Sequence, residues 1–353
     1  MNIQTSTLIP PAATRFADFA PAILKVYRRD KEAFWSAVLA PFLADSVSLF
    51  DWWGHLKVDL ELLAAFQGLD AQARQLLRDF SAPLGVDVTR WKSNRLQYFK
   101  DAYPIFAFLV IWLDEMGLDD TLTRFDDVLR SAVFGVAGYG ILDENVDSNA
   151  PSPIEILTSQ ALVAEYEALI LNVFGPTPTN LGILHKMRSI FLAAEIKEKN
   201  VRWKSSPYNA KNPQECGAKG AHVVTPFMLS LEKLGRAGQI DDYWQVFLLF
   251  GAVIQIIDDW TDLDKDLAIG HYSLVTLGVK DLPRAAANPQ TLAKVLRSDQ
   301  TQIRETYRIS QDMLAEARNI LARLDEPFLG RLVEITALRL ENYFRKELHF
   351  SQE

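Results

Sequence analysis

The sequence predicts an all-α protein, and three features lead to that expectation. Apolar residues recur at helical intervals through most of the chain, whereas the alternating pattern of strands is scarce. Several of these segments are apolar almost without interruption, as expected for helices buried in a core. The chain has no internal repeat and no low-complexity tract. We therefore expect residues 21–353 to form a single all-α domain that follows an N-terminal arm, residues 1–20.

The first half of the chain contains six segments with helical periodicity. Pro10 and Pro11 mark the arm as extended, and the helical pattern begins shortly after Pro21. The nearly continuous apolar run in residues 105–113 predicts a buried helix, and Gly117 lies in the turn that follows. The expected helices are residues 22–43, 51–66, 71–80, 93–116, 121–147 and 154–174.

The second half of the chain is organised around a helix whose apolar stretch runs from Trp244 to Ile257. It is preceded by the longest polar stretch, residues 203–217, which we interpret as a functional or mobile loop. The expected helices are residues 179–200, 218–236, 240–266, 289–325 and 328–349, the last two with breaks.

Composition limits the possible partners and cellular location. Of 353 residues, 49% are hydrophobic and 23% are charged, which is typical of globular proteins. The net charge of −8 disfavours nucleic acid as a partner. Cys216 is the only cysteine, so a disulfide framework is excluded and we interpret it as an ordinary free thiol. Without a secretory signal or an apolar run long enough to span a bilayer, we expect a soluble, cytoplasmic protein with no transmembrane segment.

The helix predicted at 240–266 ends in five aspartates within nine positions. Four of them share a helical face with an amide side chain, since their spacing follows i, i+3, i+4, i+7 and i+11. These residues are Gln255, Asp258, Asp259, Asp262 and Asp266. Carboxylates placed so closely repel one another, and a hard divalent cation such as Mg²⁺ removes that repulsion. A solvated acidic helix end is the alternative interpretation.

The helix predicted at 121–147 also ends in acidic residues, namely Asp143, Glu144 and Asp147. If two apolar helices bring such clusters face to face across a bundle, they frame a metal and diphosphate site above an apolar cavity. A third acidic group surrounds the turn at Gly117, and we interpret it as solvated. That group consists of Asp114, Glu115, Asp119 and Asp120.

At these two clusters the chain resembles the class I isoprenoid synthase superfamily, especially the trans-prenyl diphosphate synthases, over roughly residues 90–280. The residues 143–147 look like the first Asp-Asp-x-x-Asp motif of that family, with Glu144 in second place. The residues 255–262 match the second motif closely. The resemblance implies an all-α bundle around a central apolar cavity, three Mg²⁺ ions, an allylic prenyl diphosphate as substrate, and a homodimer.

The resemblance also implies which residues contact the substrate. Lys219 looks like the diphosphate-binding lysine of the family, and Arg95 aligns with the arginine of its Gly-Gly-Lys-Arg motif. Arg202, Lys204 and Lys265 are further candidates for the diphosphate. Tyr139 lies one helical turn before Asp143, where a bulky residue limits chain length in the resembling family. Gln255 is interpreted either as a contact to the diphosphate or to metal-bound water, or as a buried amide that is hydrogen-bonded to the neighbouring backbone.

Several basic residues of the chain-elongating members are missing. The segment after the first motif, residues 148–153, contains no base at all. Terpene cyclases bind a single diphosphate and use a metal triad at i, i+4 and i+8, a spacing that Asp258, Asp262 and Asp266 share. We therefore favour a Mg²⁺-dependent class I terpene synthase, a diphosphate-eliminating lyase acting on C10–C20 substrates. The alternatives are a prenyltransferase that condenses an allylic diphosphate with isopentenyl diphosphate, and an inactive regulatory homologue.

Overall fold

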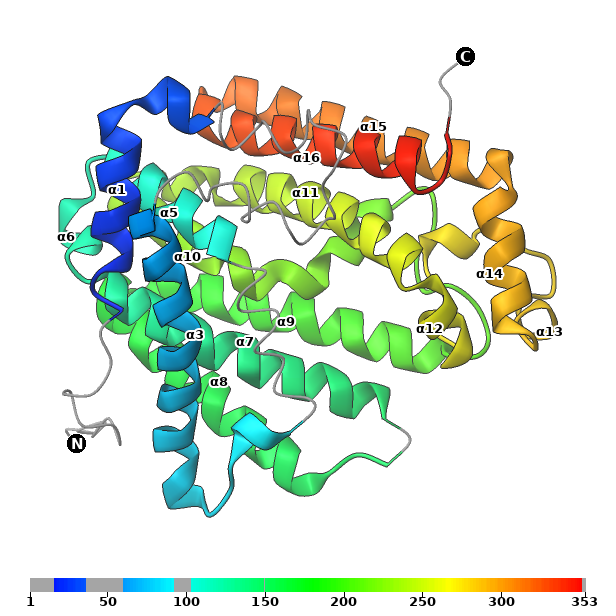
Figure 1. The fold of residues 1–353 in the computed structure, drawn as a ribbon, viewed down its shortest axis with the longest axis horizontal. Coiled ribbons are helices and arrows are strands. Elements are labelled where there is room, and N and C mark those ends of the chain that lie inside the picture. Colours follow the sequence, from blue (N-terminus) through cyan, green and yellow to red (C-terminus); the bar gives the residue numbers. More distant parts are fainter. Residues whose placement is uncertain (1–15, 36–59, 92–102, 149, 351–353) are drawn as a thin grey trace. The chain divides into compact units, whose positions relative to one another are not determined.

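The computed structural model describes the chain except for residues 1–15, 36–59, 92–102, 149 and 351–353. Every regular element in this described part is a helix, which confirms the all-α class (Figure 1). The described residues up to Leu181 form one compact unit, and those from Gly182 onward form another. The interpretation of residues 21–353 as a single domain stays a prediction.

The first unit is built around the paired helices α7 and α8, which lie side by side in Figure 1. Tyr139 of α7 is buried, and its ring meets that of Tyr166 of α8 edge-on, with the ring centroids 6.2 Å apart. Buried apolar residues line α5 and α7, as the apolar runs predict. The helices of this unit are α1 (Phe19–Arg29), α3 (Leu60–Ser81), α5 (Tyr103–Glu115), α6 (Asp119–Leu122), α7 (Phe125–Asp147) and α8 (Pro153–Phe174). Short 3-10 helices, η3 (Ala82–Leu84) and η4 (Val88–Arg90), follow α3.

The second unit is organised around α11, which packs against α15, α16 and the 3-10 helix η6. Trp260 of α11 donates a hydrogen bond from its indole nitrogen to Thr306 Oγ1 of α15 at 3.3 Å. The α-helices are α9 (Pro178–Val201), α10 (Ala221–Lys233), α11 (Ile240–Thr261), α12 (Leu263–Ala268), α13 (Leu282–Ala285), α14 (Pro289–Ser298), α15 (Gln300–Arg323) and α16 (Pro327–Lys346). The 3-10 helices are η6 (Pro213–Gly220), η7 (Ala237–Gln239) and η8 (Leu274–Thr276).

Three predicted boundaries are wrong. The helix predicted at 22–43 ends at Arg29, because Asp30 turns extended and accepts a hydrogen bond from the backbone of Ala33. The gap predicted between residues 66 and 71 is absent, since α3 runs through Gly68. A break expected within residues 289–325 lies at Asp299, which separates α14 from α15 and caps the latter by accepting from two of its backbone N–H groups. Residues 213–217, predicted as loop, belong to η6.

Three of the four acidic residues around Gly117 are exposed, in line with the solvated turn that the sequence predicts, while Asp114 is half-buried. Asp114 forms an ion pair with Arg28 of α1, and Glu115 forms one with Lys31. Glu115 also accepts a hydrogen bond from the Tyr27 hydroxyl at 2.9 Å. These two carboxylates therefore attach α1 to the end of α5.

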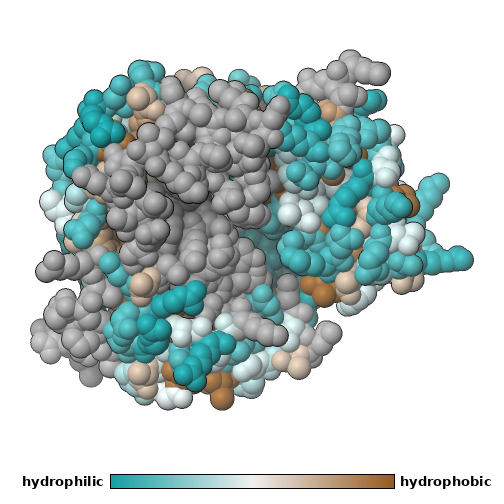
Figure 2. All heavy atoms as spheres, in the orientation of Figure 1, coloured by the Kyte–Doolittle hydropathy of each residue, from teal (hydrophilic) through white to brown (hydrophobic). Residues whose placement is uncertain are grey.

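The surface visible in Figure 2 is mainly hydrophilic wherever described residues reach it, with isolated hydrophobic residues between. Scattered exposed apolar side chains are normal for a soluble protein surface. One helical stretch among the described residues, Ala237–Thr261, is long and apolar enough to cross a membrane by length and composition alone. The core helix of a soluble protein passes the same test, and the absence of a transmembrane segment stays a prediction.

Candidate functional site

The acidic cluster of the second unit lies where α11 ends and α12 begins. The helix predicted at 240–266 is interrupted at Asp262, which separates the two helices. The interruption leaves the hydrogen-bond ladder in place: Asp262 N donates to Asp258 O at 2.8 Å, and Asp266 N donates to Asp262 O at 3.0 Å. Asp258, Asp262 and Asp266 thus keep the i, i+4, i+8 register that the sequence predicts.

Asp259 is the buried member of the cluster, with 2% of its surface exposed. Gln255 Nε2 donates to its Oδ1 at 2.9 Å, and its Oδ2 has no hydrogen-bond partner among the described residues. Burial raises the pKa of Asp259 to about 7; the Gln255 hydrogen bond opposes this shift, and the neighbouring Asp266 and Asp258 add to it. A buried carboxylate oxygen without a partner is suited to binding either a proton or a cation.

The Asp259→Asn variant is expected to gain stability relative to the wild type as the pH rises. The pKa of Asp259 in the folded protein, about 7, lies above its ordinary value of 3.8, so folding favours the protonated carboxyl group. Its contribution is complete below about pH 4 and is lost as the pH rises through 7. Asparagine mimics the protonated form at every pH. Melting temperatures measured from pH 5 to pH 8 in a metal-free buffer should show a growing difference; a constant one would contradict the shift.

Two further aspartates at this helix end have basic partners. Lys265, a predicted diphosphate contact, lies with Nζ 2.7 Å from Asp262 Oδ1. Its side chain is 76% exposed, so this pair is a weak surface ion pair that an anionic ligand can displace. Asp264, the fifth aspartate of the stretch, forms an ion pair with Arg297 of α14 at 2.5 Å. Asp264 therefore attaches α12 to α14 and is separate from the predicted metal ligands.

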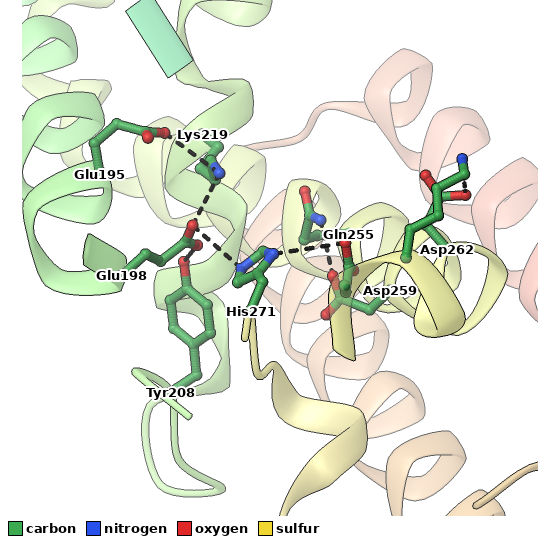
Figure 3. A network of polar contacts seen from close by, with 10 residues as sticks. Glu195, Glu198, Tyr208, Lys219, Gln255, Asp259, Asp262 and His271 are labelled. Atoms are coloured by element: carbon green, nitrogen blue, oxygen red, sulfur yellow. Dashed lines mark hydrogen bonds and ion pairs between the residues drawn. The ribbon is translucent and has the colours of Figure 1, made fainter. Parts of the chain in front are cut away.

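Asp266 leads into a buried polar network, shown in Figure 3. His271 Nδ1 lies 3.7 Å from Asp266 Oδ1, and His271 Nε2 lies 3.3 Å from Glu198 Oε2. The same Glu198 oxygen accepts a hydrogen bond from Lys219 Nζ at 2.9 Å, and its other oxygen accepts one from the Tyr208 hydroxyl. Glu195 Oε1 lies 3.4 Å from Lys219 Nζ. Here α9, the following loop, η6 and the segment after α12 converge.

The charges in this network are set by their neighbours. Burial alone would lower the pKa of His271, but Asp266 and Glu198 raise it to about 10, so the ring is charged at neutral pH. Burial works against the charged form of Glu198, but Lys219 and His271 outweigh it and hold the pKa of that carboxyl well below its usual range. The carboxylate of Glu198 therefore faces two cationic side chains, Lys219 and His271.

The basic residues predicted to contact the diphosphate differ in their burial and in their partners. Lys219 is held in the network by Glu198 and Glu195. Lys204 is exposed, and its Nζ donates to the backbone oxygen of Asn200 at 3.3 Å. Arg202 is half-buried, and Arg95 lies outside the described residues. Among these, Lys265 is the basic side chain that directly joins the aspartate cluster.

The first acidic cluster is at the end of α7, in the other unit. Asp143 and Glu144 are half-buried, and the side chain of Asp147 lies outside the described residues. Asn145 between them is buried: its Nδ2 donates to Ile141 O at 2.9 Å and to Glu155 at 2.8 Å, while its Oδ1 accepts from the backbone of Ser152. Asn145 thereby fixes the turn from α7 to α8, a role that the sequence did not suggest.

The donor set of the second cluster suits a hard cation, because all its ligands are carboxylate oxygens and one of them is buried without a partner. Asp259, Asp262 and Asp266 each face a protein partner instead, namely Gln255, Lys265 and His271. Accordingly, no three His, Cys, Asp or Glu side chains within the described residues are gathered into a ready metal site. Binding of Mg²⁺ there requires Lys265 to move from Asp262.

Sequence reasoning missed His271, Glu198 and Tyr208. In the sequence, the only indication that any of the three belongs to the site is the position of His271, five residues after Asp266. Neither a scan of the chain against protein-family models nor a search of curated proteins finds a match. The functional interpretation therefore depends on the site and on the motif resemblance.

Proposed function

We propose that the chain is a Mg²⁺-dependent class I terpene synthase that converts a linear allylic prenyl diphosphate of C10–C20 to a terpene. The observation that supports this most is the register of Asp258, Asp262 and Asp266 at the end of the buried, apolar helix α11. The proposal includes the class I isoprenoid synthase fold and a homodimer, as the motif resemblance implies. It also includes a cytoplasmic location, which the composition of the chain favours.

In this proposal Asp258, Asp262 and Asp266 would hold Mg²⁺, and Asp143, Glu144 and Asp147 are a second set of candidate metal ligands. Bound Mg²⁺ neutralises the departing diphosphate as a Lewis acid, which favours heterolysis of the allylic C–O bond. Lys265 would leave Asp262 and bind the diphosphate instead, because its ion pair with Asp262 is exposed and weak. Apolar side chains must exclude water from the cation, and aromatic faces stabilise it by roughly 0.5–2 kcal/mol each.

Two features favour cyclisation over chain elongation. Condensation with isopentenyl diphosphate requires basic residues for a second diphosphate, and residues 148–153 supply none. Lys219, the remaining family-like lysine, is already neutralised by Glu198 and Glu195. A site with so few available cations suits one diphosphate better than two.

Incubation of the protein with geranyl, farnesyl or geranylgeranyl diphosphate and Mg²⁺ is expected to release diphosphate and form a hydrocarbon or alcohol without isopentenyl diphosphate. Gas chromatography with mass detection identifies the product, and chelation of the metal is the control that should stop it. Longer prenyl diphosphates formed only with isopentenyl diphosphate would identify a prenyltransferase. No turnover with any substrate, together with no binding of metal and diphosphate, would indicate the inactive homologue.

A further inference from the structure

Glu198 of α9 is the carboxylate that the buried network shares. Only 3% of its surface is exposed, yet it contacts three polar side chains from three other segments of the second unit. Lys219 Nζ lies 2.9 Å from its Oε2, His271 Nε2 lies 3.3 Å from the same oxygen, and the Tyr208 hydroxyl donates to its Oε1. Both oxygens are occupied, so the orientation of this carboxylate is fixed (Figure 3).

His271 connects this fixed carboxylate to the aspartate cluster. Its backbone N–H donates to Asp266 O at 2.8 Å, and its Nδ1 lies 3.7 Å from Asp266 Oδ1. The imidazole therefore forms ion pairs with Glu198 on one side and with the Asp266 carboxylate on the other; the geometry at Nε2 is not that of a hydrogen bond.

We infer that Glu198 is a positioning residue, which acts through His271 to hold the carboxylate of Asp266 ready for a divalent cation. The inference rests on the proposed function, since it assigns Asp266 to the metal. A partner behind a metal ligand restricts the rotation of that ligand, and loss of such a partner typically weakens metal binding about 10–100-fold.

A matched control exists near the other end of α11. Glu326 is buried to a similar extent, accepts a hydrogen bond from the Tyr243 hydroxyl at 2.9 Å and pairs with Arg236. It therefore resembles Glu198 in burial and in its partners. Tyr243 and Asp259 lie 16 residues apart on one helix, which is roughly 24 Å at the helical rise. Loss of the Glu326 charge should lower the stability of the protein without changing the geometry of the aspartate cluster.

The test compares Glu198→Gln and Glu326→Gln in the full chain. Binding of Mn²⁺ in the presence of inorganic diphosphate is measured by electron paramagnetic resonance, and melting temperature is measured alongside. Both variants should melt below the wild type. Glu198→Gln alone should bind Mn²⁺ about 10–100-fold more weakly, while Glu326→Gln should stay within about twofold of the wild type. Equal Mn²⁺ affinity in Glu198→Gln and the wild type would overturn the inference and leave the network purely structural.

A double-mutant cycle tests the route through Asp266. If Glu198 acts through Asp266, then Glu198→Gln should cause no further loss of Mn²⁺ affinity in an Asp266→Asn background. Additive losses would overturn the assigned route.

Tyr208→Phe, which removes one of the three partners of Glu198, is the second variant if Glu198→Gln fails to fold. It should also weaken Mn²⁺ binding. A wild-type protein that binds neither Mn²⁺ nor diphosphate would overturn the proposed function, and this inference with it.

Discussion

Replacement of Asp258 by alanine is expected to abolish Mg²⁺-dependent turnover, with a loss on the order of a thousandfold or more. Asp258 is the first carboxylate of the triad and lies at the end of a buried helix, next to the buried Asp259. Without it the cluster loses a ligand charge, and the departing diphosphate loses part of its neutralisation. Asp143→Ala should have the same effect through the other cluster.

The measurement is diphosphate release at saturating substrate, together with far-ultraviolet circular dichroism to verify that the helices persist. Asp241→Ala is the matched control, since this aspartate belongs to the first turn of the same helix and its side chain is 93% exposed. Its ion pair with Lys186 is a surface contact of small energetic value. Wild-type activity in Asp258→Ala or in Asp143→Ala would refute the assignment of the metal ligands.

Much of the fold could be predicted because local patterns determine it. Apolar residues at helical spacing specified α7, α8, α9 and α11 to within a few residues. One error arose where a single side chain decided a boundary. Asp30 accepts a backbone hydrogen bond from Ala33, and an aspartate within an amphipathic pattern gives no sign of which role it will take.

The site was predictable only in its local part. The spacing of Asp258, Asp262 and Asp266 is a property of one helix end and survives the break at Asp262. The ion pairs of Lys219 could not be predicted in this way, because its partners Glu195 and Glu198 precede it by more than 20 residues and belong to another helix. In the sequence these glutamates look like the polar face of an amphipathic helix. Their burial becomes visible only when α9, η6 and His271 are packed together.

Replacement of Gly217 by alanine is expected to lower the free energy of unfolding by about 3 kcal/mol, the upper part of the range for overpacking a core. An added Cβ would lie 2.2 Å from Leu248 O and 2.6 Å from Ala252 N, and both atoms belong to the backbone of α11. Backbone cannot rotate away as a side chain can, so η6 would have to move from the helix. Urea unfolding of the full chain, followed by its helical circular dichroism signal, measures the loss.

Gly220→Ala is the matched control, because Gly220 ends the same 3-10 helix and an added Cβ there meets nothing within 4 Å. Its stability should stay within about 0.5 kcal/mol of the wild type. If Gly217→Ala is equally well tolerated, the close packing of η6 on α11 is wrong. The two variants also test whether the packing of η6 on α11 affects metal binding, since η6 contains Lys219. A shift of η6 in Gly217→Ala would displace this lysine from Glu198 and should weaken Mn²⁺ binding, whereas Gly220→Ala should leave both intact.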